Sequence, residues 1–310
     1  MLIDCHVHAG ELGKHYPDWW MAELYRGWGG LKQYSDSKAP ETEKLTLGQR
    51  LVRQMDHAGI DLMCIMTSDH RRVYPDRLGP YTPNDYLLEV KATAPERFAL
   101  TCSVDPLRDI YESVQEIERC ATVHGMKVCK LYPTYDHFDP RDPKIEPIYA
   151  KLVELDMTMQ IHMGWTPCCN APMKFQQPHL LDDVAQKFPT LRIVVAHMGW
   201  PWIEECMALV AKWEHVHADI AYWGWFGPRK VFESLKLFGR LCGFDKLVYG
   251  SENAFSTFAP DMMHNLNKQA AIVRDDPIPD ADMEKILWRN AARLWKIDTT
   301  QLEAVRKKAA

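Results

Sequence analysis

The feature that most constrains the fold is a series of eight short apolar runs that recur along nearly the whole 310-residue chain. Several of them are continuously apolar rather than alternating, which is typical of strands buried on both faces. The runs are Leu2–Val7, Asp61–Thr67, Arg97–Val104, Met126–Tyr132, Met157–His162, Leu191–His197, His215–Ile220 and Lys246–Gly250. We expect each of them to form a buried β-strand.

Segments with helical spacing of apolar residues lie between these runs. They are Thr46–Ala58, Ile110–Val123, Pro147–Leu155, Leu180–Phe188, Ile203–Trp213, Arg229–Leu241 and the last helix, Met283–Leu294. Eight strands alternating with helices predict a distorted (β/α)8 TIM barrel of the α/β class. A doubly wound open sheet is the competing architecture, but no Gly-x-Gly-x-x-Gly follows any strand. Because no linker rich in Gly, Ser or Pro divides the chain, residues 1–310 are expected to form a single domain.

Two connections are longer than the barrel requires, and both are rich in aromatic residues. Gly10–Leu45 follows the first strand and Gly164–Leu180 follows the fifth. Their large side chains are Trp19, Trp20, Tyr25, Trp28 and Tyr34 in the first, and Trp165, Met173 and Phe175 in the second. Both insertions are expected at the carboxyl ends of the strands, where they could roof an active site, cover the surface or form the interface of a homodimer or higher oligomer.

Composition excludes several classes of partner. The net charge is −5 and no basic run of five or more residues occurs, so nucleic acid and anionic membranes are poor partners. No apolar run reaches the roughly 20 residues that span a bilayer, and the N-terminus lacks the basic region of a signal peptide. The nine cysteines are scattered without C-x-x-C spacing, which favours reduced thiols in a cytoplasmic protein.

Candidate catalytic residues gather at the ends of the predicted strands. His6 and His8 are two residues apart in the first strand, so their side chains project to one face and can form half of a metal site. The other strand ends that carry metal-binding or proton-transferring residues are Lys130-Leu131-Tyr132-Pro133, His162-Met163-Gly164-Trp165, His197-Met198-Gly199-Trp200 and Gly250-Ser251-Glu252-Asn253. Because the carboxyl ends of barrel strands meet at one face, these residues are expected to converge.

A second His-x-His motif has a different position. His215 and His217 open their strand directly after a helix, so they are expected toward the opposite end of the barrel with a structural role. Asp219, farther along the same strand, is a weaker site candidate, since a cap or loop-bracing role is equally consistent with its position.

These motifs together resemble the amidohydrolase superfamily. The resemblance includes Asp4-Cys5-His6-Val7-His8, the Lys-x-x-Pro of Lys130–Pro133, the two His-Met-Gly strand ends and the Gly-Ser-acid turn, and it extends from the first strand to the final helix. The branch that is most similar contains aminocarboxymuconate-semialdehyde decarboxylase, γ-resorcylate decarboxylase and pyrone-dicarboxylate lactonase.

The resemblance implies that His6, His8, His162 and Glu252 bind one divalent metal, with His197 as proton shuttle or as ligand of a second metal. The strand-eight acid of this family is typically Asp, whereas here it is Glu252, whose extra methylene moves the carboxylate by about 1.5 Å. Glu252 could therefore ligate, bridge two metals or act as a base. Zinc suits the three-histidine, one-carboxylate set best, with manganese or iron as alternatives.

The resemblance also leaves two roles for Lys130. It is either carboxylated and bridges two metals, or it remains a cation that pairs with a substrate carboxylate, and we favour the second. Arg71 and Arg72, which follow the second strand, are candidates to bind another anionic group, and Trp165 is a candidate to contact a planar or apolar substrate.

Two chemistries use the same residues. In hydrolysis of a small amide, lactone or ester, a metal-activated water attacks while His197 moves the proton. In non-oxidative decarboxylation of an aromatic or unsaturated acid, His197 or Glu252 protonates the carbon that loses CO₂. We place hydrolysis first. A dinuclear Mn/Fe oxygenase and a non-catalytic subunit of a paired assembly are the remaining alternatives.

Overall fold

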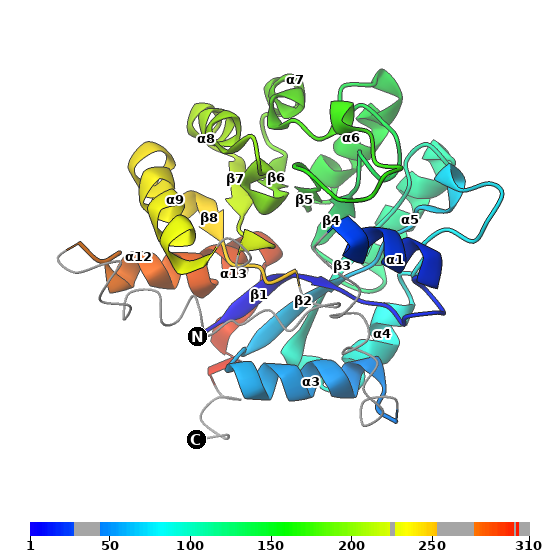
Figure 1. The fold of residues 1–310 in the computed structure, drawn as a ribbon, viewed down its shortest axis with the longest axis horizontal. Helices are drawn as coiled ribbons and strands as arrows, with labels where there is room; N and C mark the ends of the chain where they lie inside the picture. The colour runs from blue at the N-terminus through cyan, green and yellow to red at the C-terminus, as the bar shows by residue number, and fades with distance from the viewer. Residues whose placement is uncertain (28–43, 224–226, 253–275, 301, 304–310) are drawn as a thin grey trace.

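The protein is a barrel of eight parallel strands surrounded by helices (Figure 1). The computed structural model describes residues 1–27, 44–223, 227–252, 276–300 and 302–303. The strands are β1 (Ile3–His8), β2 (Leu62–Met66), β3 (Phe98–Ser103), β4 (Val128–Leu131), β5 (Thr158–Ile161), β6 (Arg192–Val195), β7 (Val216–Asp219) and β8 (Leu247–Val248). Each strand pairs in parallel with the next in sequence order, which confirms the predicted (β/α)8 barrel.

The ends of the sheet come together beside β1. Cys5 N–H donates to the carbonyl of Tyr249 at 3.0 Å, and Glu252 N–H donates to the carbonyl of His6 at 3.0 Å. Gly250 permits this approach, because a Cβ there would lie 2.7 Å from the Cβ of His6. The residues that follow β8 are therefore held directly against the first His-x-His motif.

The helices agree closely with the predicted segments. They are α1 (Asp18–Gly27), α3 (Leu47–Ala58), α4 (Tyr86–Lys91), α5 (Ile110–Thr122), α6 (Glu146–Glu154), α7 (Asp182–Lys187), α8 (Ile203–Lys212), α9 (Gly227–Cys242), α12 (Asp280–Glu284) and α13 (Asn290–Trp295). A π-helical segment, Lys285–Arg289, joins α12 to α13. Two helices are absent from the prediction. Helix α4 has only six residues, too few to show a periodic apolar face, and α1 lies in the segment Gly10–Leu45, which the sequence predicts only as a connection.

Local sequence explains where α3 begins and ends. Thr46 accepts a hydrogen bond from Gln49 N–H while the Gln49 side chain accepts from Thr46 N–H, which is a capping box. Gly59 ends the helix at φ 69°, a left-handed conformation that glycine adopts without strain.

The amino-terminal end of the barrel is filled by apolar side chains and by α13. Ile3, Cys5 and Val194 belong to an inner cluster that also includes Leu294 and Trp295. Strict alternation along β1 would then turn His6 and His8 outward. The register between β1 and β2 shifts between Asp4 and Val7, and this irregularity lets both the cluster residues and the histidines point inward.

The long insertion after β1 contains α1, which contacts the loop after β5. Trp20, Met21 and Leu24 of α1 form a small core with Tyr132, Cys168 and Ala171. Of the predicted aromatic residues, Trp28 and Tyr34 lie outside the described residues. The insertion therefore places α1 over the end of the barrel where the strands terminate.

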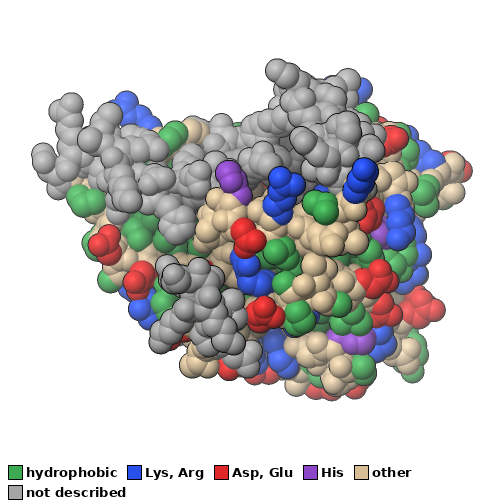
Figure 2. All heavy atoms as spheres, turned by 90° about the horizontal axis from the view of Figure 1, so that it is seen from below, with side chains coloured by type: hydrophobic (Ala, Val, Ile, Leu, Met, Phe, Trp, Pro, Cys, Tyr) green, Lys and Arg blue, Asp and Glu red, His purple; other side chains and the backbone are tan. Residues whose placement is uncertain are grey.

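The surface mixes charges of both signs. On the face seen in Figure 2, acidic and basic side chains are interspersed among apolar and polar atoms rather than gathered by sign. This part of the described surface thus lacks the concentrated positive charge with which proteins bind nucleic acid backbones. Among the described residues, no helix is long and apolar enough to cross a bilayer.

Candidate metal centre and active site

His6 and His8 lie side by side at the end of β1. Their ring centroids are 5.2 Å apart, and His6 is fully buried whereas the His8 side chain is 13% exposed. The motif therefore presents two imidazoles to the same region, as its i, i+2 spacing predicts.

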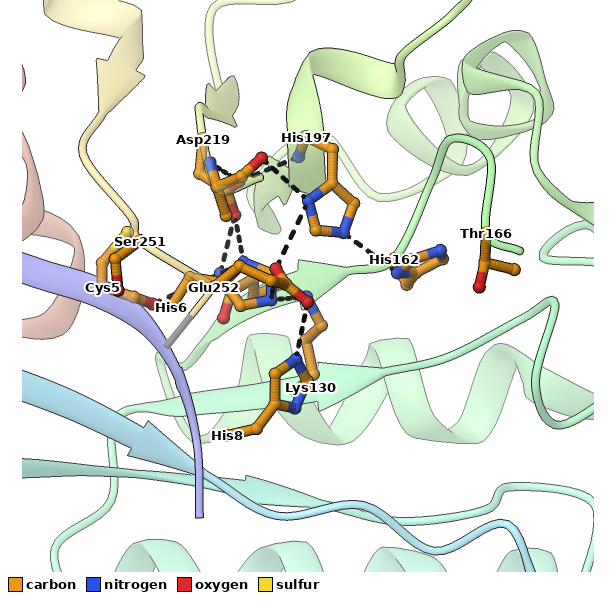
Figure 3. Close-up of polar contacts among 12 residues, drawn as sticks. Cys5, His6, His8, Lys130, His162, Thr166, His197, Asp219, Ser251 and Glu252 are labelled. Atoms are coloured by element: carbon orange, nitrogen blue, oxygen red, sulfur yellow. Dashed lines mark hydrogen bonds and ion pairs between the residues drawn. The ribbon is translucent and has the colours of Figure 1, made fainter. Parts of the chain in front are cut away.

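The Glu252 carboxylate lies between these two rings (Figure 3). Its Oε2 lies 3.2 Å from His6 Nε2 and its Oε1 lies 3.1 Å from His8 Nε2. Oε2 also lies 3.6 Å from His197 Nδ1. Burial on its own raises the pKa of Glu252, but the facing His6, His197 and His8 outweigh it and hold this pKa well below its usual range. Glu252 is therefore an anion surrounded by imidazoles.

Asp219 supports His6 from behind. Its Oδ2 accepts hydrogen bonds from His6 Nδ1 and Gln160 Nε2, both at 2.9 Å. Its Oδ1 accepts from the backbone N–H groups of His197 at 2.8 Å and Ala221 at 3.0 Å. Because a carboxylate only accepts, His6 carries its hydrogen on Nδ1 and directs the lone pair of Nε2 toward Glu252 and the site.

His162 and His197 form a second pair. His197 Nδ1 lies 3.2 Å from the carbonyl oxygen of Ala221, and its Nε2 lies 3.1 Å from His162 Nδ1. A carbonyl accepts only, so His197 carries its hydrogen on Nδ1 and its Nε2 accepts from His162 Nδ1–H. His162 Nε2 then bears a lone pair, and this buried atom has no hydrogen-bond partner among the described residues.

The backbone at His197 is held in an unusual conformation. His197 and the following Met198 have φ values of 61° and 46°, in the left-handed region that non-glycine residues rarely adopt. Trp223 Nε1–H donates to the His197 carbonyl at 2.8 Å, and Asp219 accepts from the His197 N–H. These contacts turn the imidazole of His197 toward the other site residues.

The donor atoms fit a divalent cation. Ligand atoms of His6, His197 and Glu252 lie within 4.8 Å of one another, His8 joins them through Glu252, and His162 joins through His197. Neutral imidazole nitrogens with one carboxylate are the donor set of zinc, manganese and iron(II). Nε2 of His162 is buried and has no hydrogen-bond partner among the described residues, and a bound metal would supply that partner.

Lys130 is fully buried at the inner wall of β4. Its Nζ lies 3.4 Å from His6 Nε2. Burial lowers the pKa of Lys130 to about 8, although Asp219 and Glu252 act in the opposite direction. The amine therefore stands beside the candidate metal ligands.

A cavity lies above this cluster. Its lining is largely aromatic and consists of His8, Tyr16, Trp20, Leu24, Ser68, His70, Tyr132, Tyr135, His162 and Glu252. Two candidate metal-binding histidines and the carboxylate thus reach the same space as the aromatic side chains of α1 and of the loops after β2 and β4.

Three residues predicted to bind substrate do not line the described cavity. Arg71 makes a two-point contact with Asp69, with two nitrogen–oxygen distances of 2.8 Å. Arg72 donates to Asp105 at 2.7 Å and to the main-chain oxygen of Asp136. Trp165 packs edge-on against Trp200, with ring centroids 5.6 Å apart.

Two residues contribute more to the site than the sequence analysis predicted. His70 lines the cavity although the sequence assigns it no role, and Asp219 lies at the centre of the hydrogen bonds that orient His6 and His197. His70 follows β2, so the strand-end rule that identified His162 and His197 could also have identified it.

A protein-family model described as amidohydrolase matches residues 3–297. The chain belongs to this amidohydrolase family. A curated relative, 2-keto-4-carboxy-3-hexenedioate hydratase of Sphingobium sp. (strain NBRC 103272 / SYK-6), is 26% identical over an alignment of 228 residues, and the match covers 64% of this chain and 65% of the relative. The match thus spans just under two thirds of the relative's length.

Solved structures share the barrel fold. An uncharacterised TIM-barrel protein of Bordetella bronchiseptica superposes with TM-score 0.70 at 18% identity, over 97% of this chain and 99% of its own. The 5-carboxyvanillate decarboxylase of Novosphingobium aromaticivorans was solved with bound manganese and 3-methoxy-4-hydroxy-5-nitrobenzoic acid. It superposes with a TM-score of 0.66 at 19% sequence identity, over 96% of this chain and 97% of its own. The 4-oxalomesaconate hydratase of Rhodopseudomonas palustris superposes with a TM-score of 0.58 at 19% sequence identity, over the whole of both chains.

Proposed function

We propose that this protein is a divalent-metal enzyme that adds water to a small anionic substrate. The observation that carries the proposal is the gathering of four histidines and Glu252 beneath an aromatic cavity. We propose His6, His8, His162 and Glu252 as the residues that hold one metal ion, with zinc favoured by the donor set and manganese as the alternative. When bound, such an ion polarises a carbonyl oxygen and lowers the pKa of water.

His197 is the proposed proton-transfer residue. Its Nε2 accepts a hydrogen bond from His162 Nδ1–H and its Nδ1 lies 3.6 Å from Glu252 Oε2, so the ring contacts two other residues of the cluster. A positioned base of this kind accelerates a reaction by about 10²–10⁴-fold. Glu252, held as an anion, is the second group able to accept a proton from water.

An unsaturated carboxylate is the substrate class we favour within this proposal. The curated relative is named as a hydratase of an unsaturated keto acid with carboxylate groups, and hydration and hydrolysis both begin with attack of water on an electrophilic carbon. Lys130, buried beside His6, can neutralise a carboxylate bound at the cluster. We therefore favour hydration of an unsaturated carboxylate. Hydrolysis of a lactone, ester or amide would use the same attack of water on a different electrophilic carbon.

Decarboxylation is the second candidate. Structural neighbours include 5-carboxyvanillate and 2,6-dihydroxybenzoate decarboxylases, and His197 could donate a proton to carbon in place of accepting one from water. A hydroxybenzoate would suit the tyrosine-lined cavity.

One panel of substrates separates these reactions. Protein stripped of metal and reloaded with zinc or manganese is incubated with conjugated keto dicarboxylates, lactones and hydroxybenzoates, while loss of conjugated absorbance, acid release and CO₂ are followed. We expect metal-dependent loss of absorbance, absent in His197→Asn and present in the surface control His179→Gln. Metal-dependent CO₂ release alone would move the assignment to decarboxylation, and no turnover with either metal would contradict the proposal.

The homodimer or higher oligomer expected from the sequence stays a prediction, as does residence in the cytoplasm. Light scattering of the purified chain gives the oligomeric state directly.

A further inference from the structure

A second histidine–aspartate pair lies at the cavity wall, away from the candidate metal ligands. His70 lines the cavity and is 2% exposed, and its Nδ1 lies 2.6 Å from Oδ1 of Asp136, which is fully buried. His70 follows β2 and Asp136 follows β4, so two separate loops build the pair. With Nδ1 turned to Asp136, Nε2 is the ring nitrogen left for a ligand in the cavity.

The surroundings of Asp136 favour a state in which the Asp136–His70 pair keeps the proton of the carboxyl group. Its Oδ2 is buried without a hydrogen-bond partner among the described residues, an arrangement that is costly for a carboxylate anion. Burial, with Asp105 and Asp69 nearby, raises the pKa of Asp136 well above its usual range, although Arg72 opposes this. Burial also lowers the pKa of His70 to about 4.

Both locations of that proton lead to the same result at the cavity. If the proton stays on Asp136, the acid donates to His70 Nδ1 and the neutral ring carries its hydrogen on Nε2. If it moves to the ring, both ring nitrogens carry hydrogens. His70 is therefore a hydrogen-bond donor at Nε2 in either case.

Two tyrosines connect this pair to the candidate metal site. The Tyr132 ring lies 5.0 Å from His70 and 6.2 Å from His8, measured between ring centroids. The Tyr135 ring lies 5.1 Å from His70 and 5.0 Å from His162. His70 is thus one aromatic ring away from the cluster, so a short carbon chain held at the cluster can reach it.

We propose that His70 donates a hydrogen bond from Nε2 to an oxygen of the substrate at the end remote from the cluster, and that Asp136 positions it for this role. The inference rests on the proposed function only in assuming that a carboxylate binds at the cluster. It makes His70 a specificity residue that selects substrates with a second oxygen-bearing group. Arg71 and Arg72 do not line the cavity, and their guanidinium groups already contact Asp69 and Asp105, so neither arginine is available for this role.

Two ligands of the same carbon skeleton test the inference without turnover. Glutaconate carries a carboxylate at each end of a five-carbon chain, whereas 2-pentenoate has a methyl group in place of the second. We expect the zinc-loaded protein to bind glutaconate at least tenfold more tightly by calorimetry, a difference of about 1.4 kcal/mol.

Two substitutions of His70 then separate the two nitrogens. The amide of His70→Asn reaches only the place of Nδ1, so the contact with Asp136 is kept and the donor at Nε2 is lost. The amide of His70→Gln reaches the place of Nε2. We expect the preference for glutaconate to fall below threefold in His70→Asn and to be largely retained in His70→Gln. The buried His217→Gln, at the other end of the barrel, is the matched control, and metal content is measured in each protein.

An equal preference in wild type and His70→Asn, or equal losses in His70→Asn and His217→Gln, would overturn the inference. If the variants fail to fold, a crystal structure of the wild-type protein with zinc and glutaconate decides it. An oxygen of glutaconate within 3.2 Å of His70 Nε2 supports the inference, and one beyond 3.5 Å refutes it. Both outcomes are independent of whether the substrate panel shows turnover, which tests the proposed function separately.

Discussion

Oε2 of Glu252 lies 3.2 Å from Nε2 of His6, although 246 positions in the sequence separate them (252 − 6). Glu252 reaches this position because its backbone adopts φ 63° and its N–H donates to the carbonyl of His6. The same carboxylate contacts His8 through its other oxygen. One carboxylate of glutamate length thus joins both histidines of the motif.

Glu252→Gln tests this arrangement. Removal of the negative charge is expected to reduce turnover by about 10²–10⁴-fold and to weaken metal binding, because the amide keeps the shape but not the charge. Glu252→Asp withdraws the carboxylate by about 1.5 Å, so it cannot reach both rings, and an intermediate loss is expected. Kinetics and elemental analysis measure both effects. Glu205→Gln, a surface change that affects only His179, is the control, and full activity of Glu252→Gln would remove the carboxylate from the mechanism.

Lys130→Met distinguishes the two roles of this lysine. Since burial disfavours the charged amine, as its pKa of about 8 shows, the apolar replacement is expected not to lower the unfolding temperature. Turnover is expected to fall at least tenfold because the cation beside His6 is lost. We expect one metal per chain in both proteins by elemental analysis. Loss of metal in Lys130→Met would instead identify Lys130 as a ligand, in its carboxylated form.

His217 gives the protein a predictable sensitivity to acid. Burial, together with the nearby charges of Arg293 and Lys246, lowers the pKa of His217 to about 3, so the ring is neutral in the folded state. The unfolded chain takes up this proton below about pH 6.5, so the free energy of unfolding decreases as pH falls from 6.5 toward 3. His217→Gln is expected to lose about 1 kcal/mol less than wild type between pH 7 and pH 5.5. Urea unfolding at both pH values measures it, and identical losses would contradict the assignment.

The fold was largely predictable because each strand of the barrel is a nearly continuous apolar run. The predicted strands overlap the observed ones in all eight cases, with β8 shorter than expected at Leu247–Val248. The convergence of His6, His162 and His197 followed from one topological rule, since parallel strands end on the same side of a barrel. The contacts made by the loop residues that follow each strand are harder to predict.

Arg71 and Arg72 show why. Both follow β2, as predicted, but Asp69 and Asp105 lie close enough to bind their guanidinium groups. Asp105 comes from the loop after another strand, and no local pattern reports that contact. His70, their neighbour, lines the cavity because Asp136, 66 residues later, holds its ring there. Partner choice among loop residues is set by tertiary contacts, which the sequence alone does not show.

Asp219 is expected to control metal affinity through the orientation of His6. Its two oxygens each accept from two donors, His6 and Gln160 on one side and the backbone N–H groups of His197 and Ala221 on the other. In Asp219→Asn the amide NH₂ must face one of these donor pairs, whichever way it is turned, and His6 loses the acceptor that fixes its tautomer. We expect metal affinity about 10–100-fold lower, measured by competition with a zinc chelator, and lower stability. Asp105→Asn, a buried aspartate paired with Arg72, is expected to lose stability but keep metal affinity. If both variants bound metal as tightly as wild type, the orientation of His6 would not depend on Asp219, and the geometry proposed for the site would have to be revised.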